Sequence, residues 1–122
     1  HAVAVGGMSV GADPLVSATS LISHISASQP LDGFYVRKEP KDHGTRQMIE
    51  GAAHLPPGAP VVIVEDVVTS GGSTLRAVEQ AREAGLEPLL ALALLDREEG
   101  GRAAIEVHVP LHALFTAKEL RQ

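Results

Sequence analysis

The chain has 122 residues, of which 44% are hydrophobic, and a formal net charge of −5. It contains no cysteine, which excludes disulfides, thiolate metal sites and a thiol nucleophile among these residues, and its negative charge argues against nucleic acid as the main partner. We find no signal peptide and no apolar run long enough to cross a membrane, and therefore expect a cytoplasmic protein.

Apolar runs and turn residues predict an alternation of strands and helices along one domain. The expected strands cover residues 1–5, 34–37, 61–64, 89–95, 107–109 and 111–115. The expected helices cover residues 13–27, 74–84 and 102–105, with a terminal helical turn at 116–120. This order predicts an α/β fold with a doubly wound, mostly parallel sheet flanked by helices, in which ligands bind beyond the carboxyl ends of the strands.

Individual residues mark the helix ends and two loops. Asp13 as N-cap and Pro14 as the first helical residue are expected to begin the first helix, and Gly85 to end the second. Residues 6–11 are expected to form a glycine-rich loop after the first strand. Residues 38–58 are rich in charge, glycine and proline, and we expect a long loop around one helical turn near 47–53.

Two carboxylates, Glu65 and Asp66, follow the third expected strand and precede a loop rich in hydroxyl groups and glycine. The loop consists of Thr69, Ser70, Gly71, Gly72, Ser73 and Thr74. A glycine loop that enters a helix binds phosphate, because unpaired N–H groups and the positive end of the helix dipole point at the ligand. Carboxylates beside such a loop bind sugar hydroxyls or a metal, so the segment predicts a phosphorylated ribose as ligand. Because adjacent strand residues point to opposite faces, both carboxylates can face that ligand only if the strand ends before them.

Basic residues are concentrated in one segment. Four of the ten Lys and Arg residues lie between Arg37 and Arg46, and none precedes Arg37. A short basic run is usually a solvated loop. The alternative is an anion site, in which arginine offers a bidentate fork, lysine a point charge and His43 a hydrogen bond or a proton near neutral pH.

Three segments carry a resemblance to a known family. Residues 65–73 resemble the ribose-phosphate motif of the type I phosphoribosyltransferases. Residues 37–44 resemble the mobile catalytic loop of one branch, the orotate phosphoribosyltransferases, and residues 96–100 supply a third match. The similarity runs from about Val3 to Leu120, and it implies the transfer of a phosphoribosyl group from phosphoribosyl pyrophosphate to orotate, giving orotidine monophosphate and pyrophosphate in pyrimidine synthesis.

The resemblance also implies residue roles. It implies catalytic roles for Arg37, Lys41, His43 and Asp66, with Gly44 as a hinge. It implies substrate binding by Lys38, Glu65, Asp66, Val67, Val68, Thr69, Ser70, Gly71, Gly72, Ser73 and Arg97, with Gly6 and Gly7 meeting the pyrophosphate. Arg97 would pair with the orotate carboxylate, although from sequence alone a surface ion pair with a neighbouring acid explains it equally well.

The same resemblance implies Mg²⁺, bound through pyrophosphate and ribose oxygens without a direct protein ligand. It implies a homodimer in which a mobile loop of about residues 38–51 serves the partner's site, with no nucleic acid or membrane involved. Residues 1–122 would be the core domain, lacking the N-terminal segment that caps the site in the family. Two alternatives stay open: a non-catalytic regulator that binds phosphoribosyl pyrophosphate, and a phosphoribosyltransferase for another base.

Overall fold

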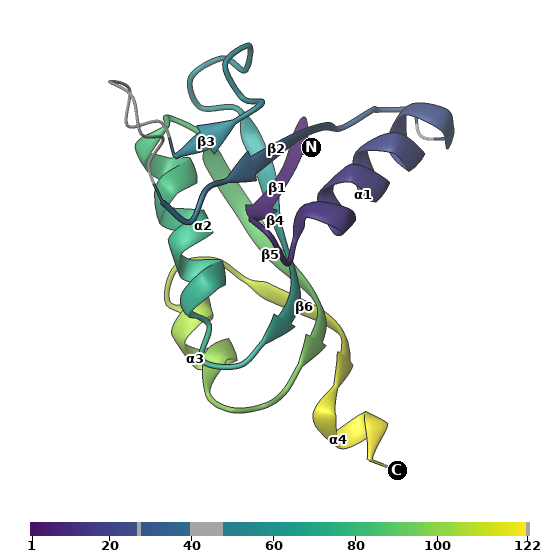
Figure 1. The fold of residues 1–122 in the computed structure, drawn as a ribbon, viewed down its shortest axis with the longest axis vertical. Helices are drawn as coiled ribbons and strands as arrows, with labels where there is room; N and C mark the ends of the chain where they lie inside the picture. The colour runs from purple at the N-terminus through teal and green to yellow at the C-terminus, as the bar shows by residue number, and fades with distance from the viewer. Residues whose placement is uncertain (27, 40–47, 122) are drawn as a thin grey trace.

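The computed structural model describes residues 1–26, 28–39 and 48–121, which form one sheet with helices on both faces (Figure 1). The strands are β1 (Ala4–Met8), β2 (Asp32–Val36), β3 (Ile49–Glu50), β4 (Pro60–Val68), β5 (Glu87–Asp96) and β6 (Leu111–Thr116). The helices are α1 (Asp13–Ser26), α2 (Gly72–Glu83), α3 (Gly101–Glu106) and α4 (Ala117–Leu120). The sheet order is β3-β2-β1-β4-β5-β6, and every neighbouring pair is parallel except β2 with β3. The predicted doubly wound, mostly parallel sheet is confirmed.

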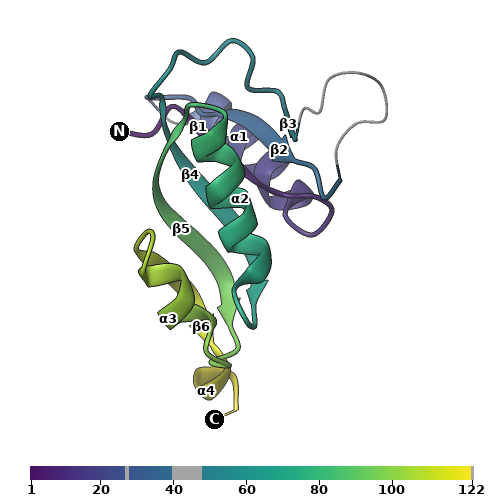
Figure 2. The same cartoon turned by 90° about the vertical axis from the view of Figure 1, so that its left-hand side faces the viewer.

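The direction of winding changes between β1 and β4. From β1 the chain passes through α1 to β2, which lies towards one edge of the sheet. From β4 it passes through α2 to β5 and then through α3 to β6, which lie towards the opposite edge. Figure 2, turned by 90°, has α2 and α3 in front of the sheet and α1 behind it. Parallel sheets of this kind bind ligands where the strand order reverses, beyond the carboxyl ends of the strands.

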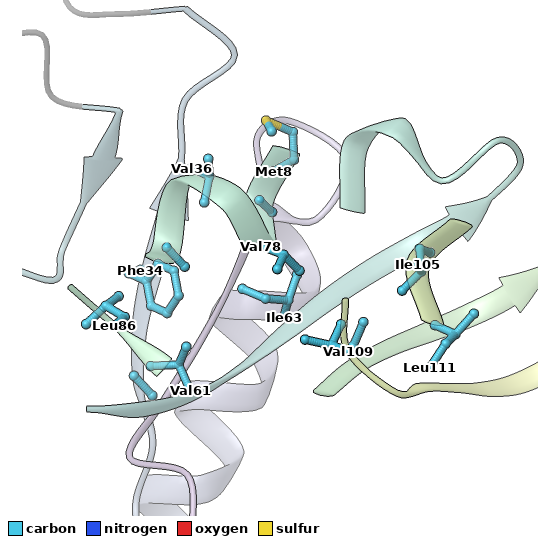
Figure 3. Packing of buried hydrophobic residues seen from close by; sticks show 14 of the residues in the cluster. Met8, Phe34, Val36, Val61, Ile63, Val78, Leu86, Ile105, Val109 and Leu111 are labelled. Carbon is cyan, nitrogen blue, oxygen red and sulfur yellow. The ribbon is translucent and has the colours of Figure 1, made fainter. Parts of the chain in front are cut away.

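Two apolar clusters hold the layers together. The larger cluster lies under α2 and α3 and includes Phe34, Ile63 and Ile105, all fully buried (Figure 3). The smaller cluster packs α1 on the opposite face through Val16 against Val64. Both clusters draw on β4, because successive residues of this strand point to opposite faces of the sheet.

The prediction of a loop at Gly6 and Gly7 is wrong, because both residues lie inside β1. Gly6 pairs with Phe34 of β2 and with Ile63 of β4, and the loop begins only at Ser9. A Cβ built on Gly6 would lie 2.2 Å from the Phe34 ring, and one on Gly7 would lie 2.5 Å from the Val64 carbonyl oxygen. These glycines therefore permit close packing within the sheet, which a sequence pattern does not distinguish from a turn.

Other boundaries also differ from the predictions. β4 continues to Val68, so the strand does not end before its two carboxylates. The helical turn expected near residues 47–53 is wrong over Ile49–Glu50, which form a short strand beside β2. Residues 107–109 form a turn after α3 in place of a strand. Val16 N–H bonds to the Ala12 carbonyl, so the first helical hydrogen bond starts one residue before the predicted N-cap.

The structure confirms the predicted end of one helix and the predicted cap of another. Gly85 ends α2 with a φ of 86°, a conformation that favours glycine, and Thr116 caps α4 by accepting a hydrogen bond from Glu119 N–H. No helix within the described ranges combines the length and apolarity needed to span a membrane.

Gly6→Ala should lower the free energy of unfolding by about 1–3 kcal/mol, because the added methyl group overpacks the core against Phe34. Urea unfolding of the single variants and of the Gly6→Ala/Phe34→Leu double variant measures this effect. The smaller leucine leaves room for the methyl group, so the double variant should lose less stability than the sum of the single losses. Strictly additive losses would contradict this packing.

Candidate functional site

The loop between β4 and α2 leaves a helix N-terminus open to solvent. Thr69, Ser70 and Ser73 are exposed, and Gly71 occupies the N-cap with a φ of 89° and no side-chain cap. The first N–H groups of a helix have no partner within it, and they carry the positive end of the helix dipole. This loop therefore offers backbone N–H groups and hydroxyls to an anion, as the sequence predicts.

A second loop packs directly against this one. A Cβ built on Gly101, at the start of α3, would lie 2.6 Å from the Thr69 carbonyl oxygen, and one on Gly71 would lie 3.1 Å from the Gly101 carbonyl oxygen. In addition, Arg97 N–H donates to the Val68 carbonyl at 3.0 Å. The structure thus brings together residues 69–73 and 97–101, two motifs that are distant in the sequence.

Glu65 is buried and bonded to the first turn of α2. Its side chain accepts a hydrogen bond of 2.9 Å from the hydroxyl of Thr74, and the two residues are only 6% and 1% exposed. Burial, together with the neighbouring Asp66 carboxylate, raises the pKa of Glu65 to about 7, while the Thr74 hydrogen bond opposes the shift. Glu65 thus exchanges a proton near neutral pH and can act as hydrogen-bond donor or acceptor.

Asp66 is less buried than Glu65 and lies beside the loop that follows β1. Its Oδ1 atom accepts a hydrogen bond of 2.8 Å from Val67 N–H, and a Cβ built on Gly11 would lie 3.1 Å from its Oδ2 atom. Asp66 therefore joins the end of β4 to the loop after β1, at the point where the strand order reverses. It also contributes to the raised pKa of Glu65, so the two carboxylates interact although β4 has not ended.

Arg97 is exposed and forms an ion pair with Glu99 at 3.1 Å. This is the surface pair that the sequence offers as the alternative to ligand binding. An exposed pair of this kind contributes about 0–1 kcal/mol, so it does not prevent the guanidinium from binding another carboxylate.

The basic segment is only partly described. Arg37 forms an ion pair with Glu50 across β2 and β3, and Arg76 of α2 donates to the Lys38 carbonyl at 3.1 Å. A hollow of about 450 Å³ is lined by Ser9, Tyr35, Arg37, Lys38, Glu39 and Glu50. Lys41, His43 and Gly44 lie outside the described residues.

A second hollow is lined by none of the predicted catalytic or substrate-binding residues that the structure describes. It measures about 710 Å³ and lies between the segment around β3 and the second half of α2. Its lining consists of Met48, Ile49, Glu50, Gly51, Ala52, Ala53, Leu55, Gln80, Glu83 and Ala84. We place the candidate site at the loops instead, because the groups that can bind an anion converge there.

Within the described part of the chain, no group of three or more His, Cys, Asp or Glu side chains could hold a metal ion. Mg²⁺ prefers oxygen ligands and keeps several waters, so these residues fit an ion that is held mainly by oxygens of a bound phosphorylated ligand.

Three residues support the site through contacts that the sequence does not predict: Thr74, Asp96 and Arg102. Thr74 belongs to the predicted loop, but its bond to Glu65 was not expected. Asp96, which is 2% exposed, accepts hydrogen bonds from Glu98 N–H at 2.9 Å and from Arg102 Nε at 3.3 Å. The only signal for these contacts was a polar residue at the end of a strand, which does not identify its partner.

No family model matches the chain. It is 50% identical over 117 residues to the orotate phosphoribosyltransferase of Sorangium cellulosum, covering 95% of this chain and 60% of that protein. The chain thus spans about 60% of the length of the curated relatives it matches.

Solved structures agree with this similarity. The orotate phosphoribosyltransferase of Mycobacterium tuberculosis in complex with Fe(III) dicitrate matches with a TM-score of 0.84 and 34% identity, over 100% of this chain and 67% of that one. The same enzyme in complex with phosphoribosyl pyrophosphate matches with a TM-score of 0.79 and 31% identity, over 98% of this chain and 66% of that one.

Glu65 makes the stability of the protein depend on pH. Its pKa rises from 4.5 to about 7 on folding, so its contribution to stability is complete below pH 4.5 and is lost as the pH rises towards 7. The stability of the wild type relative to Glu65→Gln should therefore fall by up to about 3 kcal/mol across this window. Chemical denaturation at a series of pH values measures the difference.

Glu79→Gln is the matched control, because Glu79 is an exposed glutamate of α2. Its stability should follow that of the wild type at every pH. If Glu65→Gln also follows the wild type, Glu65 does not titrate with a raised pKa.

Proposed function

We propose that this chain, which belongs to the orotate phosphoribosyltransferase family, is the core domain of an enzyme that transfers a phosphoribosyl group from phosphoribosyl pyrophosphate to orotate. The observation that supports this most is the packing of residues 69–73 against residues 97–101 through Gly71 and Gly101. Because of it, an open helix N-terminus suited to phosphate lies beside an arginine suited to a carboxylate. A phosphorylated ribose and a base that carries a carboxylate need these two sites side by side.

In the proposed complex the 5-phosphate binds at the N-terminus of α2. The backbone N–H groups of Gly72 and Ser73 and the exposed hydroxyls of Thr69, Ser70 and Ser73 are its donors. Val67 and Val68 lead from the carboxylates into this loop. Glu65 and Asp66 bind the ribose hydroxyls; β4 continues past them, but their side chains lie close enough to interact, so both can reach one ligand. Asp66 stabilises positive charge at the sugar as pyrophosphate leaves.

Orotate binds through Arg97 in this proposal. Its guanidinium can donate two parallel hydrogen bonds to a carboxylate, and the ligand would replace Glu99, whose exposed side chain returns to water. Thr69, next to Val68, lies within the same group of loops and is positioned to contact the base. The ring nitrogen of orotate then displaces pyrophosphate from the anomeric carbon, with no covalent intermediate on the protein.

The leaving pyrophosphate is assigned to the hollow beside β2. Arg37 and Lys38 line it together with Ser9, the first residue after β1. Gly6 and Gly7 are paired within the sheet, so we assign the backbone contacts to the following residues, Ser9 to Ala12, instead. Lys41 and His43 are proposed to neutralise the developing charge and to protonate the leaving group; removing a comparable stabiliser in other enzymes slows the reaction about 100- to 1,000-fold.

Mg²⁺ is the proposed cofactor, and when bound with pyrophosphate it neutralises charge on the leaving oxygens. Its ligands would be phosphate and ribose oxygens, in keeping with the few carboxylates near the loops. We further propose a cytoplasmic homodimer in which a mobile segment of about residues 38–51 serves the partner's site.

Orotate absorbance provides a direct test of the reaction. The chain, and the same chain extended to the length of its relatives, should consume orotate when mixed with phosphoribosyl pyrophosphate and Mg²⁺. Calorimetry with phosphoribosyl pyrophosphate alone should detect binding. Binding without consumption of any base by either protein would contradict the enzyme and favour a regulator, whereas consumption of adenine or uracil in place of orotate would favour another base.

Arg97→Ala should raise the KM for orotate at least tenfold while leaving the affinity for phosphoribosyl pyrophosphate within about twofold, because a charge-assisted bidentate contact contributes about 1.5–3 kcal/mol. Arg97→Lys should recover only part of the loss, since lysine lacks the planar fork. Steady-state kinetics and calorimetry separate the two effects, with the exposed Arg121→Ala as control. An unchanged KM in Arg97→Ala would remove Arg97 from orotate recognition.

A further inference from the structure

The end of β5, the turn after it and the first turn of α3 contain three features that the proposed reaction does not use. Asp96 is a buried carboxylate, with only 2% of the residue exposed. Glu98 has a φ of 62°, a left-handed backbone conformation that residues other than glycine and asparagine rarely adopt. Arg102 reaches from α3 to the Asp96 carboxylate. Asp96 and Glu98 precede and follow Arg97 in the chain, and the Arg97 side chain itself is exposed.

Asp96 fixes the backbone on the far side of Arg97. Its Oδ1 atom accepts a hydrogen bond of 2.9 Å from Glu98 N–H, while Arg97 N–H donates to the Val68 carbonyl at 3.0 Å. The N–H groups of two successive residues are thus bonded to different strand ends, β4 and β5. These two hydrogen bonds hold the backbone on both sides of the Arg97 Cα atom, and they thereby fix the direction of its side chain.

Arg102 holds Asp96 in turn. Its Nε atom donates to Asp96 Oδ2 at 3.3 Å, and its Nη1 atom donates to the Leu111 carbonyl at 2.9 Å. Because Asp96 is buried, its charge needs a partner, and the guanidinium supplies one while also bonding to the start of β6. The Glu98 carboxylate accepts a hydrogen bond of 2.8 Å from Lys118 N–H at α4, which holds the left-handed residue from its other side.

We propose that Asp96 is a positioning residue that fixes the direction of Arg97 towards the base, and that Arg102 keeps Asp96 in place. Left-handed residues are strained, and they persist where the surrounding structure holds them and the conformation serves a site. Here the strain at Glu98 turns the chain immediately after Arg97, so that the guanidinium is presented beside the loop of residues 69–73. The inference rests on the proposed function, because the orotate contact of Arg97 is part of it.

Kinetics of Asp96→Ala and Arg102→Met test this role. Both variants should raise the KM for orotate about 10- to 100-fold, since small displacements of a binding group have effects of this size, while the affinity for phosphoribosyl pyrophosphate stays within about twofold. Asp96→Asn keeps the acceptor for Glu98 N–H and should raise the KM less than Asp96→Ala. A merely structural role would instead lower stability without a selective effect on orotate, and that result would overturn the proposal.

Arg82→Met is the matched control. Arg82 Nη2 donates to the His108 carbonyl at 2.9 Å, as Arg102 Nη1 does to the Leu111 carbonyl. Within the described part of the chain, however, the guanidinium that bonds to Asp96 is that of Arg102 and not that of Arg82. The KM of Arg82→Met for orotate should equal that of the wild type. An equal rise in Arg82→Met and Arg102→Met would contradict a specific role for the Asp96 contact.

Amide hydrogen exchange gives a second readout that does not depend on turnover. Glu98 N–H should exchange at least tenfold faster in Asp96→Ala than in the wild type and in Arg82→Met. Unchanged exchange would overturn the positioning role. If the wild type does not use orotate, the proposed function fails, and the exchange data still decide whether Asp96 orders the turn after Arg97.

Discussion

The reversal of strand order between β1 and β4 is the constraint on which the candidate site depends. The chain winds outward from these two strands in opposite directions, so the connections that follow them diverge and leave their carboxyl ends uncovered. Asp66, at the end of β4, lies there against Gly11 of the loop after β1. The position of the site therefore follows from topology, whereas its chemistry depends on which residues occupy the ends of these strands.

Close backbone contacts then bring the loops together. Gly7 lets β1 approach the Val64 carbonyl, and Gly71 with Gly101 lets the loop after β4 contact the start of α3. A side chain at Gly7 or Gly101 would separate these segments or displace the backbone. Since close packing tolerates few extra atoms, these contacts also restrict relative movement of residues 69–73 and the turn that contains Arg97.

Sequence patterns predicted the elements better than the contacts between them. The β-branched run Val61–Val64 identified the central strand, and the glycine- and hydroxyl-rich loop identified the start of α2. The continuation of the strand through Glu65 was missed because a carboxylate normally marks the edge of a core; its partner Thr74 becomes visible only once α2 folds back on the sheet. Likewise, the contact between Asp96 and Arg102 of α3 arises from tertiary packing, and no local sequence pattern predicts it.

The different surroundings of Glu65 and Asp66 suit the two carboxylates to different tasks. Burial holds the pKa of Glu65 near 7, so near neutral pH it is present in both protonation states and can donate as well as accept a hydrogen bond. Asp66 is half-buried and accepts a hydrogen bond from the backbone N–H of Val67. A ribose diol offers both donors and acceptors, and under the proposed function Glu65, which can donate as well as accept, matches it better than a carboxylate that only accepts. The Thr74 hydroxyl completes this arrangement, because it orients Glu65 from the same helix whose N-terminus is proposed to bind the phosphate.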